Sequence, residues 1–308
     1  MRFEATEAAL EGLRLARREP MAMLIWTVLL LAFSVISTGI MIGLFPGLLG
    51  RMETAETSGD PTMVLSLLSQ MGQMYALLVP IYIAFYAVLY CACYRAVLRP
   101  EDKGFAFIKL GGDELRMVGL MLYQFVVWVG LCIGLSVIIG IIAVAAGFAA
   151  GAAAGAGGTG AGAGIGAVLL VIALYIAFIA VAIFIGVRLS LAAPKTFAEK
   201  KISLFGAWRL TKGEFWPLLG CYVLAWVIGI VVSLLGSAIS MVGFVIVGEG
   251  NSFDQIFSPD MSSLAAYFTA GRIVTLLIAS LFSALAYAIF VAPAAAAYRD
   301  IAGDRRAD

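Results

Sequence analysis

The chain has 308 residues, of which 63% are hydrophobic and only 13% are charged, and its formal net charge is +1. A soluble domain of this size carries about a quarter charged residues, so the composition excludes an ordinary soluble globular protein. Histidine is absent, which removes the commonest general base, the commonest metal ligand and the usual switch near neutral pH.

Long uncharged runs divide the chain. They cover Pro20–Gly50, Pro61–Tyr94, Met117–Val187, Phe215–Gly248 and Ile273–Tyr298. A transmembrane helix needs about 20 apolar residues, so four of the runs hold one span each, and the third run, which is 71 residues long, must hold two. The sequence therefore predicts an all-α polytopic membrane bundle of six transmembrane helices, folded as a single integral membrane domain over residues 1–308.

The first apolar run is expected to be a retained span over Met21–Leu44. Met1–Pro20 carries four glutamates beside its four arginines, which is unlike the positively charged start of a secretory signal. The apolar stretch that follows is also longer than a signal peptide's apolar core, and no small-residue cleavage motif ends it.

Lys and Arg alternate between the segments that separate the spans. Eighteen of the 20 lie in four alternate segments, and only Arg51 and Arg272 lie in the other loops. The four basic segments are Met1–Pro20, Arg95–Arg116, Arg188–Glu214 and the residues from Arg299 onward. Basic loops stay in the cytoplasm, so the pattern predicts a multi-pass protein of a bacterial inner membrane with both termini cytoplasmic.

The outward loop between the third and fourth spans is almost entirely Gly and Ala over Gly147–Gly166. Gly147, Gly151 and Gly155 are four residues apart, which on a helix would make a face for close helix packing. The denser glycines that follow instead favour a flexible turn. We expect helix up to about Gly151 and then a loose turn.

Three segments that lead into odd-numbered spans share one pattern, in which a basic residue is followed by Leu and, five residues after the base, by Glu. The three sets are Arg14, Leu15 and Glu19; Lys109, Leu110 and Glu114; and Arg209, Leu210 and Glu214. Returning spans agree too, because YIAFYAV at Tyr82–Val88 matches YIAFIAV at Tyr175–Val181. We therefore expect three tandem helical-hairpin repeats, at about residues 1–100, 101–198 and 199–308, all beginning on the cytoplasmic side.

The segments that lead into the odd spans are amphipathic. In Phe3–Arg18 the apolar residues Phe3, Leu10 and Leu13 share one helical face, and charged residues share another. Such helices either lie at the level of the lipid headgroups or pack against the bundle as juxtamembrane linkers, and the pattern does not separate the two.

The sequence contains no constellation that indicates catalysis. No Asp, Glu, Lys or Arg lies inside a span, which argues against a proton-coupled transporter or an intramembrane hydrolase. The four cysteines fit neither a disulfide framework nor a thiolate metal site. We expect no enzymatic activity, no metal and no cofactor.

Uncharged polar residues inside the spans support a second hypothesis, a transporter or facilitator for a small uncharged or lipid-like solute. Its cavity would be lined by Ser34, Ser37, Gln124, Tyr82 and Tyr175. Serines of the fifth span, Ser233, Ser237 and Ser240, are also polar. The simpler interpretation is that such hydroxyls bond to helix carbonyls or to a neighbouring helix.

A basic ring at the cytoplasmic ends of the spans is the candidate binding site. Arg95, Arg188 and Arg299 end the returning spans, and Lys109, Arg209 and Arg14 precede the others. Arginine forks suit phosphate headgroups, and anionic lipids collect on the cytoplasmic side. The simpler interpretation is that these charges set the topology and pair with Glu19, Glu114 and Glu214. The leading hypothesis is thus a non-enzymatic protein that engages anionic lipids or membrane partners. Association into a homo-oligomer is a further alternative, and no nucleic-acid partner is expected.

One segment, GAWRLTKGEFWPLLG at Gly206–Gly220, resembles the membrane domain attached to some bacterial glycerophosphodiester phosphodiesterases, and is similar to the YciC-like six-helix inner-membrane proteins. The resemblance implies a six-helix inner-membrane module without an active site of its own. The chain has no soluble stretch long enough for a phosphodiesterase domain, so the resemblance does not extend to that activity.

Overall fold

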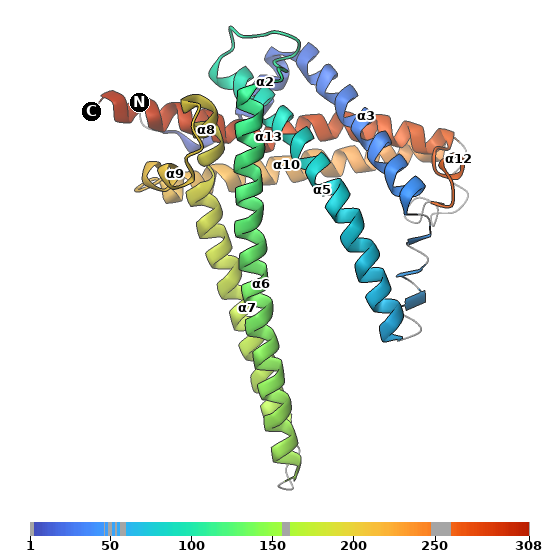
Figure 1. Cartoon of the computed structure of the whole chain (residues 1–308). Coiled ribbons are helices and arrows are strands. Elements are labelled where there is room, and N and C mark those ends of the chain that lie inside the picture. Colours follow the sequence, from blue (N-terminus) through green and yellow to red (C-terminus); the bar gives the residue numbers. More distant parts are fainter. Residues whose placement is uncertain are drawn as a thin grey trace.

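The computed structural model describes residues 3–45, 47–48, 51–52, 54–55, 60–155, 161–247 and 260–307. Six of the helices in these ranges are long and apolar enough to cross a membrane, which confirms the expected all-α fold with six spans (Figure 1). They are α3 (Pro20–Leu44), α5 (Pro61–Leu98), α6 (Gly112–Gly155), α7 (Ala161–Leu189), α10 (Phe215–Ile246) and α13 (Ala270–Ala307).

Short helices precede two of the three helix pairs. They are α1 (Ala5–Ala9) and α2 (Glu11–Arg18) before α3, and α8 (Ala192–Glu199) and α9 (Leu204–Leu210) before α10. A further short helix, α12 (Leu264–Tyr267), precedes α13. Residues 99–111, where the second amphipathic helix is expected, instead form an irregular loop closed by a bridge between Phe105 and Ile108. Only the first and third lead-in segments are therefore helical.

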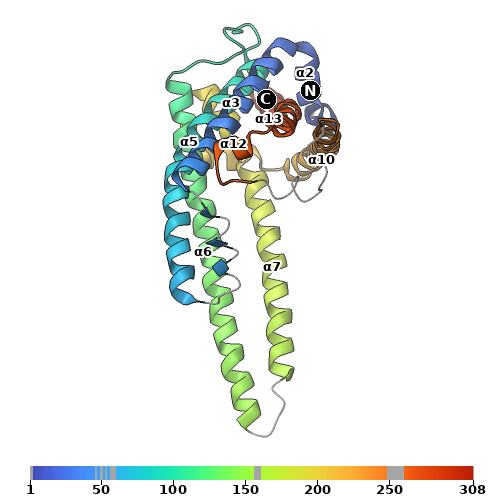
Figure 2. The ribbon, with the colours of Figure 1, turned by 90° about the vertical axis from the view of Figure 1, so that its right-hand side faces the viewer.

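The long helices form three successive pairs, α3 with α5, α6 with α7, and α10 with α13, which meet at one end and diverge at the other. In Figure 1 the α10/α13 pair runs crosswise to the α6/α7 pair, and Figure 2 shows α10 and α13 nearly end on.

The largest hydrophobic core lies where the pairs meet. It contains residues from the beginnings of α3, α6 and α10, from the ends of α5, α7 and α13, and from α2, α8 and α9. We call this region the hub. Helix α13 runs through it and supplies buried alanines, Ala284, Ala288, Ala292, Ala295 and Ala297. Small side chains let backbones approach closely, so α13 packs against α2, α3, α5 and α10 at once.

Backbone atoms of two helices approach each other closely where α2 crosses α13. A Cβ placed on Gly12 would lie 2.5 Å from the carbonyl oxygen of Ala288 and 2.5 Å from the Cα of Ile289. No real side chain tolerates such contacts with backbone atoms, so this crossing requires glycine at position 12.

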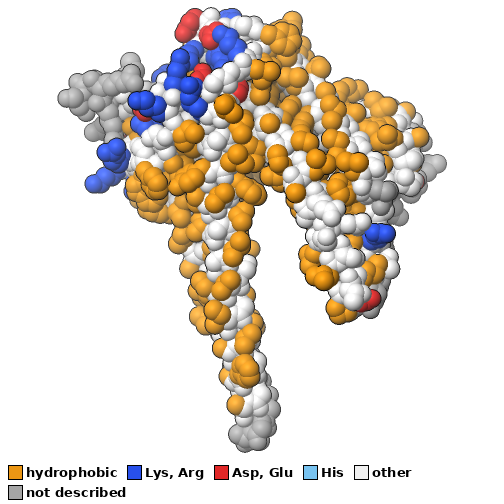
Figure 3. Space-filling view, in the orientation of Figure 1, with side chains coloured by type: hydrophobic (Ala, Val, Ile, Leu, Met, Phe, Trp, Pro, Cys, Tyr) orange, Lys and Arg blue, Asp and Glu red, His pale blue; other side chains and the backbone are white. Residues whose placement is uncertain are grey.

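Away from the hub the α6/α7 pair exposes apolar side chains along its length, as Figure 3 shows. Phe148, for example, is 77% exposed. An exposed apolar surface of this extent requires a non-aqueous neighbour, which agrees with a membrane protein. Helix α6 has 44 residues and so measures about 66 Å, longer than the roughly 40–45 Å of a bilayer with its headgroups.

The Gly/Ala-rich segment continues α6 four residues past the expected end at Gly151, to Gly155. A Cβ on Gly147 or Gly151 would meet nothing within 4 Å, so these glycines make no close helix packing. Residues 156–160 of the expected turn lie outside the described residues, and α7 begins at Ala161.

Candidate functional site

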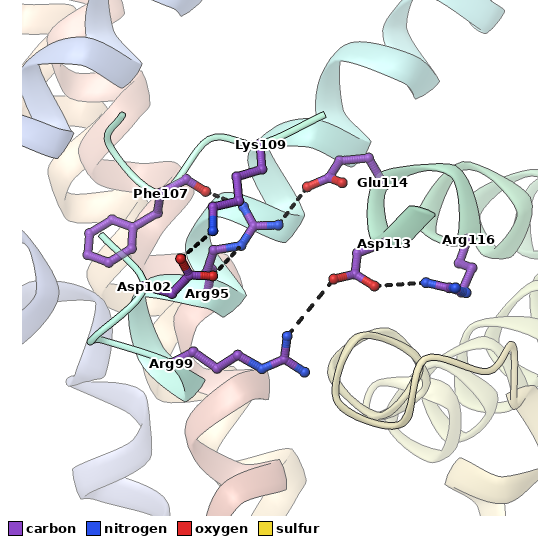
Figure 4. Close-up of polar contacts among 8 residues, drawn as sticks. All are labelled: Arg95, Arg99, Asp102, Phe107, Lys109, Asp113, Glu114 and Arg116. Carbon is purple, nitrogen blue, oxygen red and sulfur yellow. Dashed lines mark hydrogen bonds and ion pairs between the residues drawn. The ribbon is translucent and has the colours of Figure 1, made fainter. Parts of the chain in front are cut away.

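Two buried charges of the hub, Arg95 and Glu114, lie in the last turn of α5 and the first turn of α6 (Figure 4). Arg95 Nη2 donates to Glu114 Oε1 at 2.7 Å, and the two side chains are only 3% and 7% exposed. Arg95 Nη1 donates to the carbonyl oxygen of Phe107. A cation at a helix C-terminus and a carboxylate at a helix N-terminus each complement the helix dipole, so the pair joins two helix ends.

Acidic neighbours also neutralise the other cations of the α5–α6 loop. Asp102 pairs with Lys109 and lies 3.9 Å from Arg95 Nε, and the hydrogen bond from Lys109 with the nearby positive charges lowers the pKa of Asp102 below its usual 3.8. Asp113 lies 2.8 Å from Arg116 and 3.9 Å from Arg99. This loop therefore presents little uncompensated positive charge.

Two residues of the same loop, Ala106 and Phe107, have positive φ angles of 52° and 63°. Residues other than glycine rarely adopt positive φ angles. The backbone strain of such a conformation persists only where neighbouring groups hold the backbone in place. Trp26 Nε1 donates to the carbonyl oxygen of Ala106 at 3.1 Å, and Arg95 holds that of Phe107. Sequence reasoning missed Trp26 here, because its hydrogen-bonding partner is 80 residues away.

Arg188, at the end of α7, occupies a setting related to that of Arg95. Its Nη1 donates to the carbonyl oxygen of Thr211 at 2.7 Å, and its guanidinium lies 5.4 Å from the ring centre of Phe184 and 5.8 Å from that of Trp208. Each arginine thus holds a carbonyl of the segment that follows its helix. The likeness supports the expected internal repeat, which stays a prediction.

The remaining residues of the expected basic ring lie on the surface. Arg14 pairs with Glu7, Arg299 pairs with Asp300, and both side chains are about half exposed. Arg209 is exposed on α9. Since Arg95 is enclosed and committed to protein acceptors, the six basic residues do not present one uniform ring.

A second basic region combines exposed cations with exposed aromatic rings around α9. We call it the α9 surface. Its members are Lys200, Lys201, Ile202, Phe205, Trp208, Arg209, Lys212 and Trp216. Phe205 is 73% and Trp216 76% exposed. Residues 188–214 contain six Lys or Arg but only two acids, and Figure 3 shows Lys and Arg side chains gathered toward the end that holds α8 and α9.

The polar residues expected to line one transport cavity are separated in the structure. Ser37 Oγ donates to the carbonyl oxygen of Ser34 within α3, and Tyr175 is exposed on α7. Tyr82 packs edge to face on Phe33. Gln124 lines a cavity of about 220 Å³ in the hub, which also includes Tyr90, Tyr94, Ser190 and Tyr222.

A cavity of about 530 Å³ lies between α10 and α13, beyond the hub. We call it the α10/α13 groove. Its lining is Ser233, Gly236, Ser237, Ala238, Ser240, Met241, Phe244, Arg272, Thr275, Ala279, Phe282, Ser283 and Ala286. The spacing of Ser233, Ser237 and Ser240 signals one face of α10, but the sequence did not show which helix would pack against it.

The described residues contain no group of three His, Cys, Asp or Glu side chains that could hold a metal ion. Cys91, Cys93 and Cys221 are buried and Cys132 is exposed, and all four are free thiols. The chain matches no protein-family model, no curated protein and no solved structure.

Proposed function

We propose that this membrane protein is a non-enzymatic module of a bacterial inner membrane that binds anionic lipid headgroups on the cytoplasmic side through its α9 surface. The observation that carries the proposal is the exposure of Phe205 and Trp216 among four exposed cations, Lys200, Lys201, Arg209 and Lys212. Aromatic side chains favour the boundary between headgroups and acyl chains, and Lys and Arg bind the phosphates there.

The charge distribution favours the third lead-in segment, which contains α9, over the second, which is the α5–α6 loop, as the surface that binds anionic headgroups. Asp102 and Asp113 neutralise the cations of the α5–α6 loop. The side chains of Lys200 and Lys201 are both exposed, and neither forms an ion pair with any described residue. The proposal therefore narrows the six-residue ring to Arg209 and its neighbours.

The exposed apolar side chains of the α9 surface indicate how it would lie against the membrane. Ile202 and Phe205 are exposed next to the two lysines, so insertion of their side chains would bring the lysines to the phosphate level. A helix that lies in the interface combines an apolar face with Lys and Arg in this way. The resemblance of Gly206–Gly220 to six-helix inner-membrane modules fits the same proposal.

The test compares two fourfold variants by native mass spectrometry of detergent-purified protein with added phosphatidylglycerol. In one, Lys200, Lys201, Arg209 and Lys212 become Gln. In the control, four cations with acidic partners, Arg14, Arg116, Lys195 and Arg299, become Gln. Each Lys or Arg near an anionic surface contributes about 1 kcal/mol, so the first variant should lose affinity at least about tenfold.

The control variant should retain most of its lipid. Equal affinity in the first variant and the unchanged protein would contradict the proposal. Equal losses in the two variants would show that total charge, not the α9 surface, decides binding.

A second candidate function is a facilitator for a small uncharged or lipid-like solute. It rests on the α10/α13 groove and on the cavity at Gln124, both of which have hydroxyl groups in their walls. Reconstitution into liposomes and measurement of glycerol-driven swelling tests it, with Gln124→Leu as the variant. Swelling no faster than in protein-free liposomes would reject this candidate.

A further inference from the structure

The α10/α13 groove lies within one helix pair, so its geometry is independent of how the three pairs are oriented. A volume of about 530 Å³ is within the range of about 300–1,000 Å³ that is usual for ligand pockets. Phe282 packs on Gly236 in the wall of the groove, because a Cβ on Gly236 would lie 2.6 Å from the Phe282 side chain. The groove is thus a built hollow along the two helices.

One buried hydroxyl in the groove has no partner among the described residues. Ser240 is only 5% exposed, and its Oγ makes no hydrogen bond, although it lines the groove. By contrast, Ser237 donates to Ser233 and Thr275 to Gly271 along their own helices. A buried polar atom without a partner is costly, so Ser240 indicates a ligand group that hydrogen-bonds at this depth.

A cation lies at the mouth of the groove, at the ends of α10 and α13 away from the hub. The guanidinium of Arg272 lies 5.6 Å from the ring centre of Phe244 and 5.7 Å from that of Tyr267. A guanidinium beside aromatic faces is held by cation–π attraction, and arginine is a side chain that binds phosphate. The two rings therefore help to hold a positive charge at the mouth of the groove.

The groove presents different side chains at different depths. Ser240 is four residues nearer the hub than Phe244, which corresponds to about 6 Å of helix rise. Below Ser240 the walls continue as Gly236, Phe282 and Ala286, where no charged residue lines the groove. A cation, then a hydroxyl, then an apolar channel is the order of groups that complements phosphate, glycerol ester and acyl chain.

We infer that the α10/α13 groove binds an anionic glycerophospholipid, with its phosphate at Arg272, an ester carbonyl at Ser240 and an acyl chain along Phe282 toward Ala286. The site is at the opposite ends of the helices from the α9 surface, and it would hold one lipid as a bound ligand. The α9 surface, in contrast, would contact headgroups of the surrounding leaflet. The two proposals therefore stand or fail separately.

The experiment uses phosphatidylglycerol with a diazirine on one acyl chain, incorporated with the full-length protein into phosphatidylcholine nanodiscs. After irradiation, mass spectrometry maps the crosslinked peptides. We expect crosslinks at residues 233–244 and 275–286, and fewer when phosphatidylcholine carries the same diazirine chain. Equal crosslinking by the two probes would overturn the assignment of the phosphate to Arg272.

Two substitutions separate groove binding from general lipid contact. Ala279→Trp fills the groove and should lower these crosslinks about tenfold, whereas Ala180→Trp, on the exposed face of α7, should leave them unchanged. Ser240→Ala changes only one hydroxyl and should lower them about threefold, the scale of one hydrogen bond, even if the larger variant fails to fold. Unchanged crosslinking in Ser240→Ala and in a folded Ala279→Trp would overturn the inference.

Headgroup selectivity gives an independent readout. Arg272→Gln should abolish the preference for phosphatidylglycerol over phosphatidylcholine, and Arg272→Lys should restore part of it. The other occupants of such a groove are a second copy of the chain and a neutral solute. A protein–protein crosslink at α10, or displacement of the probe by a neutral solute alone, would overturn the phospholipid assignment.

Discussion

Arg95 and Glu114 form a buried ion pair that ties the last turns of α5 to the first turn of α6, with 2.7 Å between Nη2 and Oε1. Arg95 also holds the carbonyl oxygen of Phe107, so one side chain fixes both ends of the α5–α6 connection. Removing one partner of a buried pair leaves a charge without compensation, which costs about 3–5 kcal/mol. Surface pairs contribute only about 0–1 kcal/mol.

The substitution Glu114→Gln is therefore expected to lower the free energy of unfolding by about 3 kcal/mol, because it leaves the buried Arg95 charge with only the more exposed Asp102, 3.9 Å from its Nε, as an acidic partner among the described residues. Thermal unfolding of the purified protein in detergent measures the effect, with Arg299→Gln as the control at a half-exposed pair. The control should change stability little. Equal melting temperatures for the two variants would show that the Arg95–Glu114 pair does not hold the hub.

The substitution Ala106→Gly should leave the protein as stable as before or raise its stability by up to about 1 kcal/mol. Ala106 has a φ of 52°, which glycine adopts without the steric cost that alanine pays. The matched change Ala198→Gly, within helix α8, should lower stability by about 1 kcal/mol. Melting temperatures of the two variants test this prediction. A loss of stability in Ala106→Gly as large as in Ala198→Gly would contradict the strained backbone that we assign to Ala106.

The substitution Gly12→Ala should lower the free energy of unfolding by about 1–3 kcal/mol, the usual cost of overpacking. The added Cβ would lie 2.5 Å from backbone atoms of α13, which cannot turn away as a side chain can. Gly220→Ala is the control, because nothing lies within 4 Å of its Cβ position. Similar melting temperatures for the two variants would argue against the close α2–α13 crossing.

Acid should weaken the α5–α6 loop through Asp102. Its pKa is below the usual 3.8, mainly because Lys109 donates a hydrogen bond to the carboxylate. A carboxyl group with a lowered pKa in the folded protein stabilises it above its ordinary pKa, and that contribution is lost as the pH falls through the lower value. The melting-temperature difference between the unchanged protein and Asp102→Asn should therefore be largest near neutral pH and shrink below pH 3.8. A difference that is constant with pH would contradict this.

Topology is tested by labelling single cysteines in whole cells with a membrane-impermeant maleimide, in a background without the four native cysteines. The distribution of Lys and Arg predicts that Asp60→Cys and Ser262→Cys are labelled from outside. Glu101→Cys and Lys200→Cys, at the hub, should react only after permeabilisation. The reverse pattern would place the α9 surface outside the cell and remove the basis for cytoplasmic lipid binding.

Much of the fold follows from local sequence, as the first and fifth spans illustrate. Met21–Leu44 lies within α3, and the uncharged run Phe215–Gly248 contains α10. Hydropathy adds up over neighbouring residues, and a backbone in lipid must satisfy its own hydrogen bonds, so a long apolar run has little choice but helix. The lead-in segments are less determined by local sequence, because the second of them was expected to be helical and instead forms a loop with a bridge between Phe105 and Ile108.

The candidate sites depended on tertiary structure. The sequence marked Arg95 as one of six similar cations, but only the fold encloses it beside Glu114 and leaves Arg209 exposed. The serines of α10 likewise could be recognised as part of a groove only in the structure, where Arg272 and Phe282 of α13 line the same cavity. Composition and hydropathy alone determined the six apolar helices, since these are properties of contiguous segments. Which charges are neutralised and where a hollow forms were decided by contacts between residues far apart in the chain, which no local pattern records.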